Sequence, residues 1–139
     1  MKPLKILDAS VALKWFIEEP SGQEAADLLL AEVEASPKNF LVPDLFFAEM
    51  LHVLNRVMQN EDKVKEAISL LEDLGIERVG LGHELLKTAA HIAGRYKLSG
   101  YDAIYAATAK LTKGRWYTFD EKAHKKLKSL NISVAVGTP

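Results

Sequence analysis

Two acidic residues, Asp8 and Asp120, directly follow short and largely apolar segments at 5–7 and 115–119. Segments of this length and composition are typical of strands buried in a sheet. Because ligands of open α/β sheets bind beyond the carboxyl ends of the strands, both carboxylates stand where chemistry is expected. Carboxylates in such a place can hold a divalent cation or transfer protons.

Two further acids lie in predicted helices without a basic residue one turn away. The neighbours of Glu49 at that spacing are Leu45 and Val53, and the next turn after Asp102 contains Tyr105. Ordinary ion pairing along a helix is therefore not available to either carboxylate. Glu49 and Asp102 join Asp8 as acids whose local surroundings do not account for them.

Each of the four acids also has a purely structural interpretation. Asp8 and Asp120 could cap the helices that follow them, Asp102 could complete a capping box with Ser99, and Glu49 could simply be exposed. If instead all four converge at one sheet edge, their repulsion raises at least one pKa unless a cation neutralises them. An all-oxygen donor set favours Mg²⁺ or Mn²⁺, and the chemistry indicated is metal-assisted hydrolysis of a phosphodiester.

The elements that would position these acids alternate along the chain. The pattern predicts strands over 5–8, 40–42, 76–79, 115–119 and 132–136, and helices over 9–17, 44–58, 61–74, 83–96, 101–113 and 121–130, with one more helix after residue 21. Short apolar strands separated by helices predict an α/β fold, a three-layer α/β/α domain with a short central parallel sheet. Residues 1–139 are expected to form this single domain.

Several residues carry signals for where helices begin and end. Ser21 and Glu24 have the spacing of a capping box, Asp44 can cap the helix that follows it, and Gly75 is a natural helix terminator. Gly80–Gly82 begins like a dinucleotide-binding loop but lacks the third glycine of that motif. The pair Glu49 and His52 has di-iron spacing but no second copy in the chain, which argues against such a site.

The composition limits the classes of protein to consider. The chain has 139 residues, of which 48% are hydrophobic and 27% charged, which is typical of one globular domain. It contains no cysteine, so disulfides, zinc–thiolate sites and thiol nucleophiles are excluded. We expect no membrane association and a cytoplasmic location, because the chain shows neither a signal-peptide pattern nor an apolar run of about 18 residues.

Basic residues gather around Asp120 although the formal charge of the whole chain is −1. The segment 110–128 holds seven basic residues and two acids, a local balance of +5. A run of charge is usually a solvated helix face, but here it would also lead phosphates toward the proposed metal site. Lys122, Lys125 and Arg115 are the candidate RNA-binding residues, and Trp116 and Tyr117 could stack on a base, although a strand favours the core.

Four segments together resemble the acidic motifs of PIN-domain nucleases, in the order usual for that family: Asp8–Ser10, Ala48–Met50, Tyr101–Ala107 and Thr118–Asp120. The resemblance spans the whole chain and is most specific in the last two segments. The single-domain length particularly resembles VapC-type toxins, the ribonuclease halves of toxin–antitoxin pairs. Two other Mg²⁺-binding α/β classes, receiver domains and haloacid-dehalogenase phosphatases, require acid pairs near the first strand that Asp8–Ser10 lacks.

The resemblance implies a Mg²⁺- or Mn²⁺-dependent endoribonuclease that hydrolyses RNA. It implies these roles for individual residues: Asp8, Glu49, Asp102 and Asp120 as catalytic metal-binding acids, with Thr118 and Ser10 as polar support. Many relatives have Asn at the position of Ser10, where this chain departs from the pattern. The family also implies a homodimer and a small antitoxin partner. A PIN nuclease that processes RNA without an antitoxin, and a PIN fold that binds RNA or protein without cutting, are the alternatives.

Overall fold

A five-stranded parallel sheet forms the centre of the computed structural model, which describes residues 3–137. The strands are β1 (Lys5–Leu7), β2 (Phe40–Pro43), β3 (Glu77–Val79), β4 (Arg115–Thr118) and β5 (Ser133–Ala135). They lie in the order β3-β2-β1-β4-β5, and every neighbouring pair is parallel. The first strand is therefore central, and the sheet extends from it in both directions.

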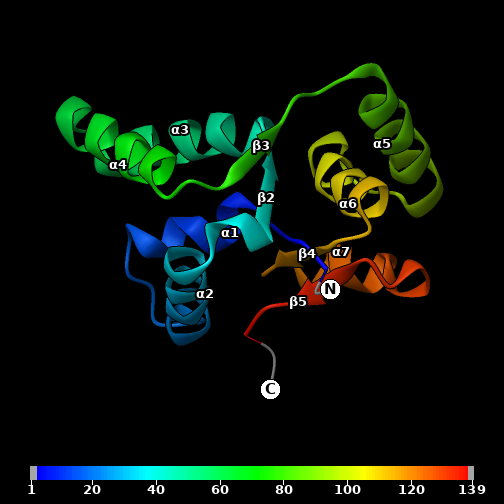
Figure 1. The fold of residues 1–139 in the computed structure, drawn as a ribbon, viewed down its shortest axis with the longest axis horizontal. Coiled ribbons are helices and arrows are strands. Elements are labelled where there is room, and N and C mark those ends of the chain that lie inside the picture. The colour runs from blue at the N-terminus through cyan, green and yellow to red at the C-terminus, as the bar shows by residue number, and fades with distance from the viewer. Residues whose placement is uncertain (1–2, 138–139) are drawn as a thin grey trace.

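Helices cover both faces of this sheet (Figure 1). The helices are α1 (Ala9–Ala12), α2 (Gln23–Ala35), α3 (Leu45–Met58), α4 (Glu61–Asp73), α5 (His83–Tyr96), α6 (Gly100–Thr112) and α7 (Glu121–Lys126). Right-handed crossovers place α1–α4 on one face and α5–α7 on the other, because the strand order reverses between β3 and β4. The predicted three-layer α/β architecture with a parallel sheet is confirmed.

The reversal of strand order creates a switch point between β1 and β4. Connections leave these neighbouring strands toward opposite faces, so a crevice opens beyond their carboxyl ends. The register pairs Leu7 with Tyr117, which brings the residues following both strands to the same edge. This edge is where Asp8 and Asp120 begin the next elements.

The largest buried side chains lie under this edge. Trp116 of β4 and Tyr105 of α6 are 0% and 1% exposed, and their rings stack with centroids 5.9 Å apart and an interplanar angle of 13°. Burial excludes Trp116 from stacking on a base at the surface. Ile6 and Leu7 of β1 complete the core at this level.

Two predicted helices are shorter than expected. The segment expected to be one helix over 9–17 is α1 followed by a 3₁₀ helix at Leu13–Trp15, and α7 is likewise followed by a 3₁₀ helix at Lys128–Leu130. Hydrophobic spacing cannot separate a 3₁₀ turn from an α-helical one over so few residues. Between Ala35 and β2 lies a further unpredicted 3₁₀ turn, Pro37–Asn39.

The helix boundaries confirm one predicted signal and contradict two. Gly75 follows α4 with φ +78°, as expected of a terminator. The predicted capping box at Ser21 is wrong, because the N-cap of α2 is Gly22. Its φ is +80°, and a Cβ there would lie 2.5 Å from the Phe119 ring. Asp44 precedes α3 without a side-chain capping bond and instead accepts from Arg78 at 3.1 Å. In the described part of the chain, no helix is long and apolar enough to cross a membrane.

Candidate active site

Asp8 occupies the switch point directly after β1 and is only 7% exposed. Its Oδ1 accepts hydrogen bonds from the backbone N–H of Ser10 at 3.0 Å and from the Ser10 hydroxyl at 2.5 Å. Its Oδ2 accepts from Nε1 of Trp116 at 3.0 Å. Asp8 is therefore the cap of α1, as its structural interpretation predicted, and is also fixed from the side of β4.

Asp120 begins α7 beyond the end of β4 and remains exposed. Its Oδ1 accepts from the backbone N–H of Ala123 at 3.0 Å, and its own N–H donates to Thr118 Oγ1 at 3.0 Å. The Ser10 hydroxyl accepts from the backbone N–H of Phe119 at 3.2 Å and so joins the ends of the two strands. Ser10 and Thr118 thus lie where polar support of the acids was expected.

Asp102 and Glu49 approach the same edge from helices on opposite faces of the sheet. Asp102 lies in the first turn of α6, where its backbone N–H donates to Ser99 Oγ at 3.0 Å. Glu49 lies in α3, is half-buried, and accepts a 2.6 Å hydrogen bond at Oε1 from the hydroxyl of Tyr105. The purely structural interpretation of Glu49 as an exposed side chain is therefore wrong.

The four acids act on one another electrostatically. Burial raises the pKa of Asp102, and the charges of Asp120 and Asp8 raise it further. Burial also raises the pKa of Glu49, to which the charge of Asp102 adds. The pKa of Asp8 is raised by burial as well, against the opposing effect of its hydrogen bonds. Negative charge is thus concentrated at an edge that a cation would stabilise.

The donors fit a hard divalent cation. All four side chains supply carboxylate oxygens, the ligands preferred by Mg²⁺ and Mn²⁺. Within residues 3–137 no group of three or more acidic or histidine side chains is arranged to hold a metal ion. Mg²⁺ sites usually combine one or two carboxylates with water and substrate phosphate, so an open arrangement suits this ion.

The predicted RNA-binding residues lie on two different edges. Lys122 and Lys125 are exposed on α7, the helix that Asp120 begins. Arg115 instead begins β4, so it lies at the opposite end of that strand from the acids, and it donates to Asn131 Oδ1 at 3.2 Å. The structure therefore separates Arg115 from the other two.

Two residues of the site were missed as partners of the acids, Tyr105 and Trp116. Tyr105 lies three residues after Asp102 in the helical motif, which is a usable signal for the same helix face. No pattern in the sequence indicates that the indole of Trp116 donates to an acid 108 positions earlier. A third, Lys126, lowers the pKa of Asp102 and donates to the carbonyl of Lys97 at 2.8 Å.

A family model described as PIN domain matches residues 5–129, nearly the whole chain. The chain belongs to the PIN domain family. A search of curated proteins finds no match to it.

Solved structures share this PIN fold at low sequence identity. The chain is similar to VapC20 of Mycobacterium tuberculosis, a sarcin–ricin loop cleaving toxin, with TM-score 0.74 and 17% identity, covering 96% of this chain and 99% of that one. It is similar to a toxin–antitoxin complex from Klebsiella pneumoniae, with TM-score 0.67, 21% identity and coverage of 94% and 95%. VapBC2 from Rickettsia felis, bound to a promoter DNA fragment, gives TM-score 0.70, 9% identity and coverage of 94% and 96%. The predicted likeness to VapC-type proteins is confirmed for the fold.

We expect Asp102→Asn to stabilise the metal-free PIN domain. Because folding raises the pKa of Asp102 above its ordinary 3.8, the ionised group costs stability at neutral pH, and the cost disappears as pH falls toward 3.8. The melting temperature at pH 7 should rise by roughly 1–3 °C, and the gain should vanish near pH 4. Differential scanning calorimetry in EDTA measures both effects.

The control is Glu66→Gln, which removes the same charge from the exposed face of α4. It should leave the melting temperature nearly unchanged. Added Mg²⁺ should raise the melting temperature of the parent more than that of Asp102→Asn, because a ligand stabilises the state that binds it. Equal Mg²⁺ shifts in parent and variant would contradict a role of Asp102 in binding the ion.

Proposed function

We propose that this PIN domain is a metal-dependent endoribonuclease and the toxin of a toxin–antitoxin pair. The observation that supports the proposal most is the electrostatic effect of Asp8 and Asp120 on Asp102 and of Asp102 on Glu49, with pKa values raised at Asp8, Glu49 and Asp102. Similar folds in a toxin that cleaves the sarcin–ricin loop and in a toxin–antitoxin complex support the choice of RNA as substrate and of an antitoxin as partner. We infer that it acts in the cytoplasm, where a cysteine-free chain needs no disulfide.

The four acids would hold Mg²⁺ or Mn²⁺, and the bound ion would supply an activated water and stabilise the charge that develops on the phosphate. Ser10 holds Asp8 through its hydroxyl and joins it to the backbone of Phe119, so the two strand ends keep a fixed separation. Thr118 holds the backbone of Asp120 in the same way. Tyr105 holds Glu49 by donating to its Oε1 at 2.6 Å.

Removing one acid should abolish RNA cleavage. We expect Asp8→Asn to lower the rate about 100-fold or more in Mg²⁺ or Mn²⁺, since metal stabilisation of transition-state charge is worth several kcal/mol. Cleavage of mixed RNAs, followed on denaturing gels with circular dichroism as the folding check, tests this. Asp73→Asn, which changes an exposed acid of α4, should cleave like the parent. Undiminished cleavage in EDTA would contradict the proposal. RNA binding without any cleavage would favour a non-cleaving PIN module.

The exposed lysines of α7 are proposed to guide RNA to the acids. Lys122 and Lys125 follow Asp120 on one short helix, so phosphates bound there lie beside the site. Arg115, predicted with these lysines, lies at the far end of β4 and is not part of this path.

Lys122→Ala combined with Lys125→Ala should weaken binding of single-stranded RNA and reduce the slope of log affinity against log salt by about 1.4, that is about 0.7 for each lost phosphate contact. Fluorescence anisotropy with a labelled RNA between 50 and 300 mM salt, roughly the range in which such slopes are resolved, measures this. Lys63→Ala with Lys65→Ala removes the same charge from α4 and serves as control. An unaltered slope would place the RNA path elsewhere.

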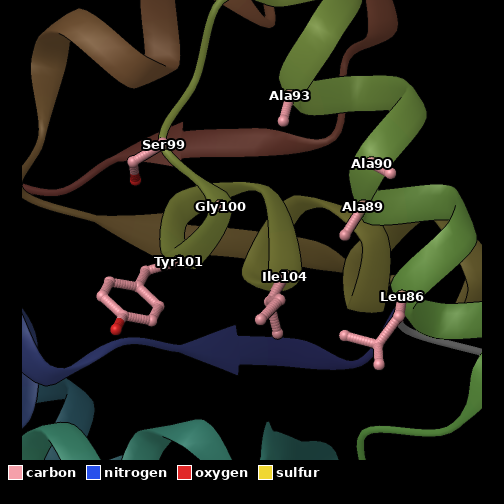
Figure 2. A pocket seen from close by; sticks show the side chains of 8 residues that line it. All are labelled: Leu86, Ala89, Ala90, Ala93, Ser99, Gly100, Tyr101 and Ile104. Atoms are coloured by element: carbon pink, nitrogen blue, oxygen red, sulfur yellow. The ribbon is translucent and has the colours of Figure 1, made fainter.

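A homodimer is proposed through the face formed by α5 and α6. A cavity of about 440 Å³ opens between these helices, lined almost entirely by apolar side chains (Figure 2). At its rim Leu86 is 45% and Tyr101 64% exposed. Exposed apolar surface rimming a cavity is typical of protein contacts. Leu51 and Val57 on α3 and Leu70 on α4 are also exposed, and we propose these helices for contact with the antitoxin.

Leu86→Glu should convert a dimer to a monomer of 15.4 kDa in light scattering at micromolar concentration. Leu28→Glu, at a more exposed leucine of α2, should leave the dimer intact. A monomeric parent would contradict the dimer.

A small antitoxin-like reading frame beside the coding sequence is the observation that distinguishes a toxin from an RNA-processing PIN nuclease.

A further inference from the structure

Two stacked aromatic side chains hold two of the four acids from inside the core. We propose that Tyr105 and Trp116 are positioning residues that fix Glu49 and Asp8 for divalent-cation binding, each by donating one hydrogen bond to one carboxylate oxygen. The proposal rests on the proposed function only in that these acids bind the cation. Neither aromatic residue need contact RNA or the ion itself.

The indole of Trp116 can act on Asp8 in one way only. Nε1–H is a donor without acceptor capacity, so it supports Oδ2 of Asp8 only while that oxygen accepts. The indole is 0% exposed and its position is set by β4, so water cannot replace this bond without opening the core. Ser10 supplies the bonds to the other oxygen, Oδ1, which leaves the carboxylate little freedom to rotate.

The phenol of Tyr105 acts on Glu49 in the same manner. Its hydroxyl donates to Oε1 at 2.6 Å, and burial together with the charge of Glu49 raises the pKa of Tyr105 well above its ordinary value, so the proton stays on the tyrosine. Among residues 3–137, Oε2 of Glu49 receives no hydrogen bond from the protein. One oxygen is thus anchored and the other remains available to a ligand.

Stacking joins the two anchors into one unit. The rings lie 5.9 Å apart between centroids and within 13° of parallel, with Tyr105 supplied by α6 and Trp116 by β4. The acids they hold come from α3 and from the end of β1. Four elements are therefore tied together by two hydrogen bonds and one ring contact. The relative placement of Asp8 and Glu49 depends on a rigid core contact and not on their own flexible side chains.

In other metal sites, the residues that donate hydrogen bonds to the metal ligands strongly affect the affinity for the metal. Mutating a hydrogen-bonding partner of a metal ligand usually costs about 10–100-fold in metal affinity. Such a partner also restricts the rotamers of the ligand, so the cost falls on binding of the ion more than on stability of the fold. This difference separates a positioning role from ordinary core packing.

The test compares Trp116→Phe and Tyr105→Phe with the parent. Both variants keep an aromatic ring. Tyr105→Phe removes only the hydroxyl donor, whereas Trp116→Phe removes the N–H donor together with part of the buried indole. Mn²⁺ titrated by isothermal calorimetry should bind about 10-fold or more weakly to each variant. The matched control is Trp15→Phe, which removes a tryptophan whose Nε1 donates to the backbone oxygen of Ala26, outside the site. This control should bind Mn²⁺ within about twofold of the parent.

Fluorescence supplies a second readout that does not depend on activity. The chain has two tryptophans, so Trp15→Phe leaves Trp116 as the only indole and Trp116→Phe leaves Trp15. Mn²⁺ should change the emission of Trp15→Phe, which reports on Trp116, and leave the emission of Trp116→Phe unaltered. Thermal unfolding of each variant separates lost affinity from lost stability, because a residue that only fills the core would lower the melting temperature without changing Mn²⁺ affinity.

The outcomes distinguish this proposal from the proposed function. Parent-like Mn²⁺ affinity in both donor-free variants would overturn the positioning role even if the parent cleaves RNA. Weakened Mn²⁺ binding in the variants, with a parent that binds Mn²⁺ but cuts no RNA, would support the positioning role and overturn the nuclease. A parent that binds no Mn²⁺ at all would overturn both.

Discussion

Repulsion among carboxylates at the carboxyl ends of β1 and β4 is the constraint to which the rest of the molecule is fitted. Like charges brought together and partly buried destabilise a fold unless hydrogen bonds or a cation offset them. Here the offset comes from fixed donors: the hydroxyl of Ser10, the indole of Trp116 and the phenol of Tyr105. The protein thereby keeps negative charge at a place where free acids would separate, which is the charge that the proposed cation would offset.

Helix caps and site residues coincide in this PIN domain. Asp8 and Asp120 each close the first turn of a helix through Oδ1, which makes them necessary to local structure whether or not a ligand is present. The second oxygen of Asp8 accepts from the buried indole of Trp116, so this carboxylate is held from both sides. Structural and chemical interpretations of such an aspartate are therefore not exclusive, because one carboxylate has enough lone pairs for both.

The features that follow from local spacing were predictable and those that depend on long-range packing were not. Alternating strands and helices indicated the parallel sheet. The lack of a basic residue one helical turn from Glu49 or Asp102 indicated from the sequence alone that these acids are unusual. The start of α2 after Gly22 was not predictable, because it depends on the close approach of the Phe119 ring, a residue far away in the sequence. The role of Trp116 was missed for the same reason. Its strand position indicated burial correctly, but a hydrogen bond across 108 positions leaves no local pattern.

The central position of β1 governs when the site can exist during synthesis. Lys5 pairs both with Phe40 and with Arg115, so the middle of the sheet joins the earliest strand to one made much later. Pairings this distant in sequence form slowly and only after both partners have left the ribosome. Until β4 and Asp120 have emerged, a nascent chain has Asp8 and Glu49 without the indole and the fourth acid. Under the proposed function, the site would therefore be complete only after most of the chain has been translated.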